Sequence, residues 1–241
     1  MAIFTMSDLH LSLDTDKSME VFGYAWHNYI ERIRENWLEL IKDSDTVLIG
    51  GDISWAMHLK DCRKDFEFLN SLPGRKILFK GNHDYWWESM TKMNSFVGEA
   101  GFDTLTFMQN GSFLCEGVLI GGTRGWNLPG DGGFGDDDRK IYQREFLRLE
   151  LSFKSGRQLC EEQGISPLKN VCVLHYPPFT KDGTPDEAFV SLMKDYGITD
   201  CFYGHLHSLG TNNAIEGEFD GITFRLVSAD YLGFRPVEVK K

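Results

Sequence analysis

Lys80-Gly81-Asn82-His83-Asp84 is the stretch from which the fold and the site of this chain can be worked out. It follows Lys76-Ile77-Leu78-Phe79, a mostly apolar run that is typical of a buried strand. Residues 85–90 come next and can open a helix, so Asn82 and His83 are expected on the turn between a strand and a helix. Open α/β sheets bind ligands at such turns, outside the carboxyl ends of their strands.

Four other turns that follow predicted strands also carry residue types that bind metals. They are Ser7-Asp8-Leu9-His10, Gly51-Asp52, His175 and Gly204-His205-Leu206-His207. Together with His83 they hold five of the seven histidines of the chain, which a random scatter would seldom do. The candidate ligands, with His83 left over, are Asp8, His10, Asp52, Asn82, His175, His205 and His207.

The chemistry of this set indicates a metal centre. Its donors are oxygens and imidazole nitrogens, without a thiolate, which suits Mn, Fe or Zn rather than a soft metal. The set is too large for one catalytic ion that must keep an open position, but it suffices for two ions if one carboxylate bridges them. Two ions about 3.5–4 Å apart can clamp the attacking and leaving oxygens of a displacement at phosphorus.

The first third of the chain alternates between predicted strands and predicted helices. The strands are expected at 2–6, 46–49 and 76–79. Between them, apolar residues recur at helical spacing, first from Phe22 to Ile41 and then from Leu59 to Leu69. Ser54 is expected to cap the second helix. This βαβαβ order implies parallel strands.

The rest of the chain predicts a second sheet. Short strands are expected at 105–107, 112–114 and 117–120, with Asn110-Gly111 as a hairpin signal, so the second sheet would begin with an antiparallel segment. The glycine-rich stretch 122–138 is expected to form a lid-like loop before a helix at about 139–162. Further strands are expected at 171–174, 200–203 and 222–227, the last closing the sheet. Residues 1–241 are predicted to form one domain.

The composition bears on partners and location. With 36 acidic and 25 basic residues, the formal net charge is −11. An acidic chain repels polyanions, which argues against nucleic acid or an anionic membrane as a partner. The five cysteines form no CxxC pair, and no apolar run approaches the length of a membrane span. We therefore expect a cytoplasmic protein with reduced thiols, and the sequence does not indicate its oligomeric state.

The motif order DxH, GD, GNHD, H and GHxH resembles that of the calcineurin-like metallophosphoesterase superfamily. The motifs run from Asp8 to His207, so the resemblance covers nearly the whole chain. It implies an α/β fold, a four-layer α-β-β-α sandwich of two mixed sheets flanked by helices, with a dinuclear site at the strand ends. By position, the first metal would be held by Asp8, His10 and His207, the second by Asn82, His175 and His205, and both by a bridging Asp52.

The resemblance also implies an activity. His83 and Asp52 would be catalytic, with His83 contacting the substrate phosphate beside Asn82 and assisting the leaving group rather than binding metal. The expected reaction is the hydrolysis of a phosphomonoester or phosphodiester, a small molecule, by attack of a metal-bridging hydroxide. Mn is favoured as the metal. Three stretches, 52–57, 84–87 and 122–126, resemble an uncharacterised bacterial group within the superfamily, which brings no assigned substrate.

One departure concerns the phosphate-binding groups. Protein Ser/Thr phosphatases continue their GD motif with a further Asp and an Arg, where this chain has Trp55 and Ala56. His83 then needs another orienting partner, and whether the adjacent Asp84 faces it is open. Arg124, the cation of the glycine-rich stretch, is expected to bind phosphate in place of the missing Arg. The alternative is an ion pair between Arg124 and an acid such as Asp131 or Asp136.

Three other functions compete with a small-molecule phosphoesterase. A protein phosphatase is opposed by the loss of the Asp and Arg after the GD motif. A nuclease is opposed by the acidic balance and the lack of a Lys/Arg-rich run. A non-catalytic scaffold on the same fold could lose a ligand without penalty, yet the full set is present.

Overall fold

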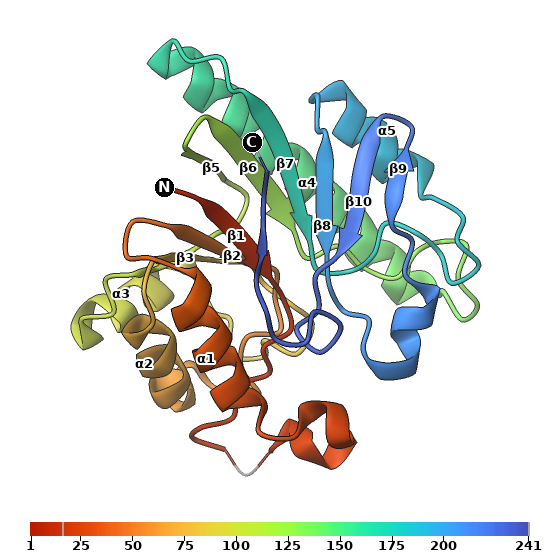
Figure 1. Cartoon of the computed structure of the whole chain (residues 1–241). Coiled ribbons are helices and arrows are strands. Elements are labelled where there is room, and N and C mark those ends of the chain that lie inside the picture. Colours follow the sequence, from red (N-terminus) through yellow and green to blue (C-terminus); the bar gives the residue numbers. More distant parts are fainter. Residues whose placement is uncertain (16, 241) are drawn as a thin grey trace.

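The computed structural model of the chain describes residues 1–15 and 17–240. It contains two mixed β-sheets with helices on their outer faces (Figure 1). The strand order is β11-β1-β2-β3-β4 in the first sheet and β5-β6-β7-β8-β10-β9 in the second. The predicted α/β sandwich of two mixed sheets flanked by helices is confirmed.

Each sheet is parallel in its centre and antiparallel at an edge. In the first, β11 is antiparallel to β1, and the strands are β1 (Ile3–Met6), β2 (Thr46–Ile49), β3 (Arg75–Leu78), β4 (Leu105–Phe107) and β11 (Val237–Glu238). In the second, β5 and β9 are the antiparallel edges, and the strands are β5 (Ser112–Cys115), β6 (Val118–Thr123), β7 (Lys169–Leu174), β8 (Asp200–Tyr203), β9 (Gly217–Phe219) and β10 (Ile222–Leu226).

The α-helices flank the sheets on opposite sides of the molecule (Figure 1). The first sheet is covered by α1 (Tyr29–Leu40), α2 (Arg63–Ser71) and α3 (Met90–Ala100). The second is covered by α4 (Asp136–Gln163) and α5 (Glu187–Asp195). Short 3-10 turns complete the chain: η1 (Met19–Phe22), η2 (Tyr24–Trp26), η3 (Leu59–Cys62) and η4 (Ser208–Asn213).

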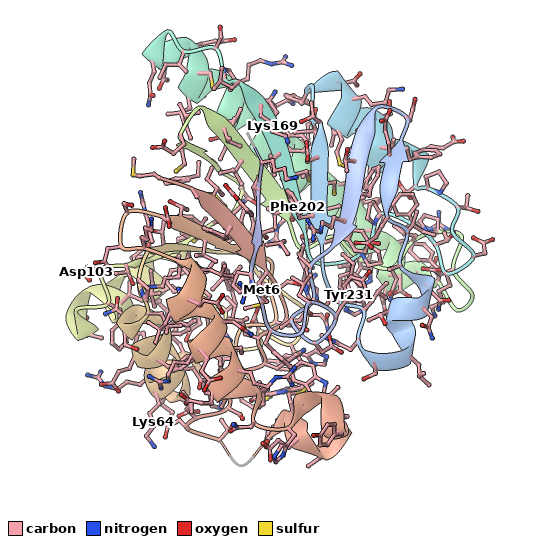
Figure 2. The ribbon with its side chains drawn as sticks, viewed as in Figure 1. Met6, Lys64, Asp103, Lys169, Phe202 and Tyr231 are labelled. Carbon is pink, nitrogen blue, oxygen red and sulfur yellow. The ribbon has the colours of Figure 1, made fainter. Side chains whose placement is uncertain are left out.

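Three apolar clusters fill the spaces between these four layers. Successive side chains of a strand point to opposite faces, so Leu48 packs between the sheets while Val47 and Ile49 pack beneath the helices of the first sheet. Phe202 of β8 meets the first sheet from the other side (Figure 2). Because both faces of the first sheet are covered, β1 and β2 are buried along their whole length without alternation.

The helix predicted through Phe22–Ile41 is wrong in its first half. The chain forms η1 and η2 there, and α1 begins only at Tyr29. Gly23 and Asn28 have φ of 120° and 52°, which an α-helix cannot contain, so the apolar spacing is kept without a continuous helix. The predicted cap at Ser54 is also wrong. Ser54 lies well before Arg63, where α2 begins, and its hydroxyl donates to the Asp65 carboxylate at 2.5 Å.

The hairpin predicted at Asn110-Gly111 is wrong as well. The preceding strand, β4, pairs in parallel with β3 of the first sheet, whereas β5 pairs with β6 of the second. Asn110 takes a left-handed conformation, with φ of 54°, and the turn there carries the chain from one sheet to the other. The second sheet is closed by β9 rather than by β10.

The stretch without regular structure is shorter than the predicted 122–138. β6 continues to Thr123 and α4 already begins at Asp136, so the loop covers residues 124–135. Its lid function stays a prediction. Within the described residues, no helix is long and apolar enough to cross a membrane.

Candidate metal centre

The predicted ligands come together where the strands end. The turns after β1 and β2 are joined by the amide of Asp8, which donates to the carbonyl of Gly51 at 2.8 Å, and those after β7 and β8 by Gly204 and His175 at 3.0 Å. Figure 2 labels Met6, where β1 ends, and Lys169, where β7 begins, and the two lie far apart. The ligand-bearing turns lie on the side of Met6, where the strands end. All seven candidate ligands are therefore brought to one edge of the two sheets.

Four of these ligands have a left-handed backbone. The φ angles are 61° at Asp8, 45° at His10, 49° at Asp52 and 72° at His205. Residues other than glycine seldom take this conformation, and Asn, Asp and His tolerate it best. The left-handed residues turn the chain sharply after each strand, and such sparsely populated conformations cluster at functional sites.

Asp8, His10 and His207 form the first group. The Nε2 atoms of His10 and His207 are 3.2 Å apart, and Nε2 of His207 is also 3.2 Å from Oδ1 of Asp8. Burial opposes the charge on His207, but the carboxylates of Asp8 and Asp230 outweigh it and raise the pKa of His207 to about 10. Without metal, a proton on His207 balances Asp8 at the place where a cation would do so.

Asn82, His175 and His205 form the second group. Oδ1 of Asn82 lies 2.6 Å from Nε2 of His175 and 2.9 Å from Nδ1 of His205. Nδ1 of His175 is 3.2 Å from the carbonyl of Gly50, to which it can donate its proton. The lone pair on Nε2 then faces the Asn82 oxygen, and these two acceptors repel each other. A cation bound by both would remove this repulsion.

Asp52 lies between the two groups. Its Oδ2 is 3.7 Å from Nε2 of His10 and 3.4 Å from Nε2 of His175. This oxygen is buried and has no hydrogen-bond partner among residues 1–15 and 17–240. Burial raises the pKa of Asp52 well above its ordinary value, and the carboxylates of Asp8 and Asp84 add to the effect. A divalent cation is the partner that this arrangement lacks, so the residues fit a metal centre.

Motif glycines give the carboxylates their space. A Cβ on Gly81 would lie 2.1 Å from Oδ1 of Asp52, and a Cβ on Gly204 would lie 2.3 Å from Oδ2 of Asp8. Both distances are shorter than any real contact of that kind. The glycines of the GNHD and GHxH motifs are therefore required by the carboxylates of other turns.

Asp84 points away from His83, which settles the open question about its partner. Its carboxylate accepts the backbone amides of Asp52 at 3.0 Å, Ile53 at 2.9 Å and Gly81 at 2.7 Å, with Ser54 and the indole of Trp86 as further donors. It therefore ties the turn after β2 to the turn after β3. This role was not predicted from the sequence.

The ring of His83 is positioned by an aromatic neighbour. Its centroid lies 4.6 Å from that of Trp55, and Trp55 also stacks on His10 at 4.8 Å. The His83 amide donates to Oδ1 of Asp52 at 2.7 Å, while Nδ1 is buried and unpaired within the described chain. Trp55, which stands where protein phosphatases have Asp, thus packs against both a candidate ligand and the candidate acid.

Asp230 joins the site without having been predicted from the sequence. Its Oδ1 is 2.9 Å from Nδ1 of His207, which leaves Nε2 of that ring to face Asp8 and His10. Carboxylates that orient a ligating imidazole in this way are common around metal sites. A signal was available, because Asp230 follows the predicted strand 222–227 at the same edge of the sheet.

Arg124 has a different partner from those considered. Its Nη2 lies 3.3 Å from the carboxylate of Glu145 in α4, and its guanidinium stands 4.4 Å from the ring centroid of Trp126. The alternative, an ion pair with an acid, is therefore present, but neither Asp131 nor Asp136 is the partner in the described part of the chain. Asp131 accepts backbone amides of the loop and of Lys181. Contact between Arg124 and substrate phosphate stays a prediction.

Comparison with known proteins gives a match to a family model and matches to solved structures. The model of the family described as calcineurin-like phosphoesterase matches residues 1–209. The phosphopantetheinyl hydrolase from Mycobacterium tuberculosis has a similar structure, with a TM-score of 0.54 at 13% sequence identity over 99% of this chain and 95% of that chain. This identity supports a shared fold alone.

Two further solved structures match with lower TM-scores. One is a protein of unknown function from Aquifex aeolicus, at 0.45 and 16% identity over 98% of this chain and 95% of that one. The other, from Thermus thermophilus, gives 0.49 and 13% over 85% and 81%. A search of curated proteins found no match.

Proposed function

The chain belongs to the calcineurin-like phosphoesterase family, and we propose that it hydrolyses a small phosphate mono- or diester with the help of two divalent cations. The observation that carries the proposal is the buried Oδ2 of Asp52, which has no hydrogen-bond partner in the described chain and lies near Nε2 of both His10 and His175. One carboxylate placed between two ligand groups suits a bridge between two ions.

The ligands follow the two groups. Asp8, His10 and His207 would hold one cation, Asn82, His175 and His205 the other, and Asp52 both. Mn, Fe and Zn all suit a set of oxygen and imidazole donors, and Mn is the metal we expect among them. When bound, the pair would lower the pKa of a water and neutralise charge on the phosphoryl oxygens.

The protein's own groups would orient the ester and supply a proton. His83 is half-buried, and its amide is fixed by Oδ1 of Asp52, so its ring can be aimed at an ester bound beside Asn82. There its N–H would donate a hydrogen bond to the leaving oxygen. Burial lowers the pKa of His83, so only the fraction of the ring that is protonated would pass a proton to that oxygen and become neutral. Trp55 keeps the ring in place and water away from one of its faces.

The charge of the chain bears on the class of substrate. A net charge of −11 does not favour a polyanion such as DNA. The Mycobacterium tuberculosis neighbour is named a phosphopantetheinyl hydrolase, which supports phosphoester hydrolysis on this fold. At 13% identity, that name does not extend to the substrate of this chain.

The test is a substrate panel assayed with Mn, Fe and Zn in turn. It contains chromogenic mono- and diesters, cyclic nucleotides, single-stranded DNA and a phosphopeptide. Small esters should be hydrolysed by the wild type and not by Asp52→Asn, while the exposed control Asp43→Asn should retain activity. Preferred cleavage of DNA would mean a nuclease, preferred cleavage of the phosphopeptide a protein phosphatase, and no hydrolysis with any metal a scaffold.

A further inference from the structure

A polar cavity lies beside the metal centre. It has a volume of about 180 Å³ and lies between the carboxyl ends of β3 and β6 and the side of α4. We call it the basic pocket, because its lining includes Lys80, Arg124 and Arg148. None of the candidate metal ligands lines it in the described structure, so it is separate from the centre.

The charges around the basic pocket do not balance. Glu145, whose side chain is 1% exposed, lies 3.3 Å from Arg124, 2.8 Å from Arg148 and 3.6 Å from Arg144. One buried carboxylate therefore faces three guanidinium groups. The other acid of the lining, Glu88, is paired with Lys92 outside the pocket. A surplus of positive charge remains, in a chain whose overall charge is strongly negative.

Several donors at the basic pocket have no acceptor. Nε of Arg124 is buried and makes no hydrogen bond within residues 1–15 and 17–240. Gln109 accepts the indole N–H of Trp87 at 3.2 Å through its oxygen, which leaves its NH₂ group as a donor. The ammonium of Lys80 makes neither a hydrogen bond nor an ion pair in the described part of the chain. These groups are suited to an anion with several oxygens.

We propose that the basic pocket binds a phosphate group at a site distinct from the metal centre. Pockets for drug-sized ligands usually exceed about 300 Å³, so this one fits a single compact anion rather than a whole nucleotide. A guanidinium group can donate two hydrogen bonds to two oxygens of one phosphate. A chloride or a single carboxylate offers fewer acceptors to the several donors of this pocket.

The basic pocket is connected to the metal centre through the backbone. Lys80 stands two residues before Asn82, and the carbonyl of Arg124 accepts the amides of His175 at 3.1 Å and Tyr176 at 2.8 Å. A phosphate held here would thus fix backbone that carries two candidate ligands. The bound group is either a second phosphate of the substrate or free phosphate, and both share this chemistry.

The binding test needs no hydrolysis, so it is independent of the proposed activity. Chelator-treated protein is titrated with inorganic phosphate in a calorimeter. Wild type should bind at this site, and Arg148→Gln should weaken binding about tenfold or more, the usual effect of losing a charge-assisted partner. Lys154→Gln, an exposed cation on the same helix, is the matched control and should bind as wild type does.

Lys80→Gln repeats the test from another element, in case substitution in α4 disturbs folding. It too should weaken phosphate binding. The proposal is overturned if metal-free wild type binds no phosphate, or if folded Arg148→Gln and Lys80→Gln both bind with wild-type affinity, because phosphate would then bind elsewhere.

A kinetic arm separates the two sources of phosphate. If the substrate supplies it, Arg148→Gln should raise KM for a bisphosphate about tenfold more than KM for the matching monophosphate. If the bound group is free phosphate, added phosphate should change wild-type turnover of the monophosphate at concentrations that do not affect Arg148→Gln. Either result supports the site and assigns its ligand.

Discussion

Asp52→Asn is expected to be at least as stable as wild type without metal, and less stable than wild type when metal is added. In metal-free protein, the Asp52 carboxylate is buried, and one of its oxygens lies within 4.8 Å of an oxygen of Asp8. Two like charges at that distance repel by at most about 3 kcal/mol at an effective dielectric constant of about 20, and the proton on His207 offsets part of this repulsion. The amide has no charge, so this repulsion disappears.

The amide can also be accommodated locally. Its oxygen can keep the 2.7 Å bond from the amide of His83. Its NH₂ group would face Nε2 of His10 and His175, and burial lowers the pKa of both rings, that of His175 to about 3. Both imidazoles are therefore neutral at pH 7 and can accept a hydrogen bond. In chelator at pH 7, Asp52→Asn should be as stable as wild type or up to about 3 kcal/mol more stable.

The sign of the pH dependence follows from the raised pKa of Asp52. Folded protein binds the proton more tightly than unfolded protein, so wild type loses stability as the pH rises from the ordinary value of 3.8 through the folded pKa. Asn has no such proton. The advantage of the variant in chelator should therefore shrink toward pH 4.

Metal should turn the order around. A site occupied at one hundred times its Kd adds about 2.7 kcal/mol, and wild type should gain this or more in Mn, while Asp52→Asn gains little. Urea denaturation in chelator and in Mn measures both effects, and Asp43→Asn is the control for a lost surface charge. A variant clearly less stable than wild type in chelator, or equal stabilisation of both proteins by Mn, would contradict the role given to Asp52.

Three more outcomes are expected. His83→Ala should retain metal and lower kcat by about 10²–10⁴-fold, and a loss of metal in elemental analysis would instead make His83 a ligand. Asp230→Asn should weaken metal binding by about 10–100-fold, because His207 loses its charged partner; unchanged affinity in a metal titration would contradict this. Burial lowers the pKa of Lys76 from 10.5 to about 8, so stability should rise between those pH values by about 3 kcal/mol relative to Lys76→Met; parallel pH profiles in urea melts would rule this out.

The motif turns were predictable because each is local. A strand that ends in DxH or GNHD fixes its ligand within a few residues, and parallel strands bring such ends to one edge. The pairing of β4 was not predictable in this way. Asn110 turns the chain in either case, and only the packing of β4 beside β3 decides which sheet it joins. The two-residue strand β11 is likewise too short to leave a pattern.

The environment of the centre depends on partners that are distant in sequence. Arg124 contacts Glu145 because α4 packs beside the end of β6. The spacing of the two residues in the sequence does not predict this ion pair. Trp55 suggested only a missing Asp, whereas in the fold its ring packs against His83. Asp84 serves the backbone instead of its neighbouring side chain. Residue type indicated that a site exists, but tertiary contacts decide how each member is held.

The division of the ligands between the two sheets has a consequence for biosynthesis. Asp8, His10, Asp52 and Asn82 leave the ribosome well before His175, His205 and His207. Chains fold from the amino terminus as they are made, so β1 to β4 can collapse while three of the seven candidate ligands are still missing. On the proposed assignment, each metal takes ligands from both sheets, so both sites would be completed only after the second sheet has been made. Metal binding would then join the two sheets.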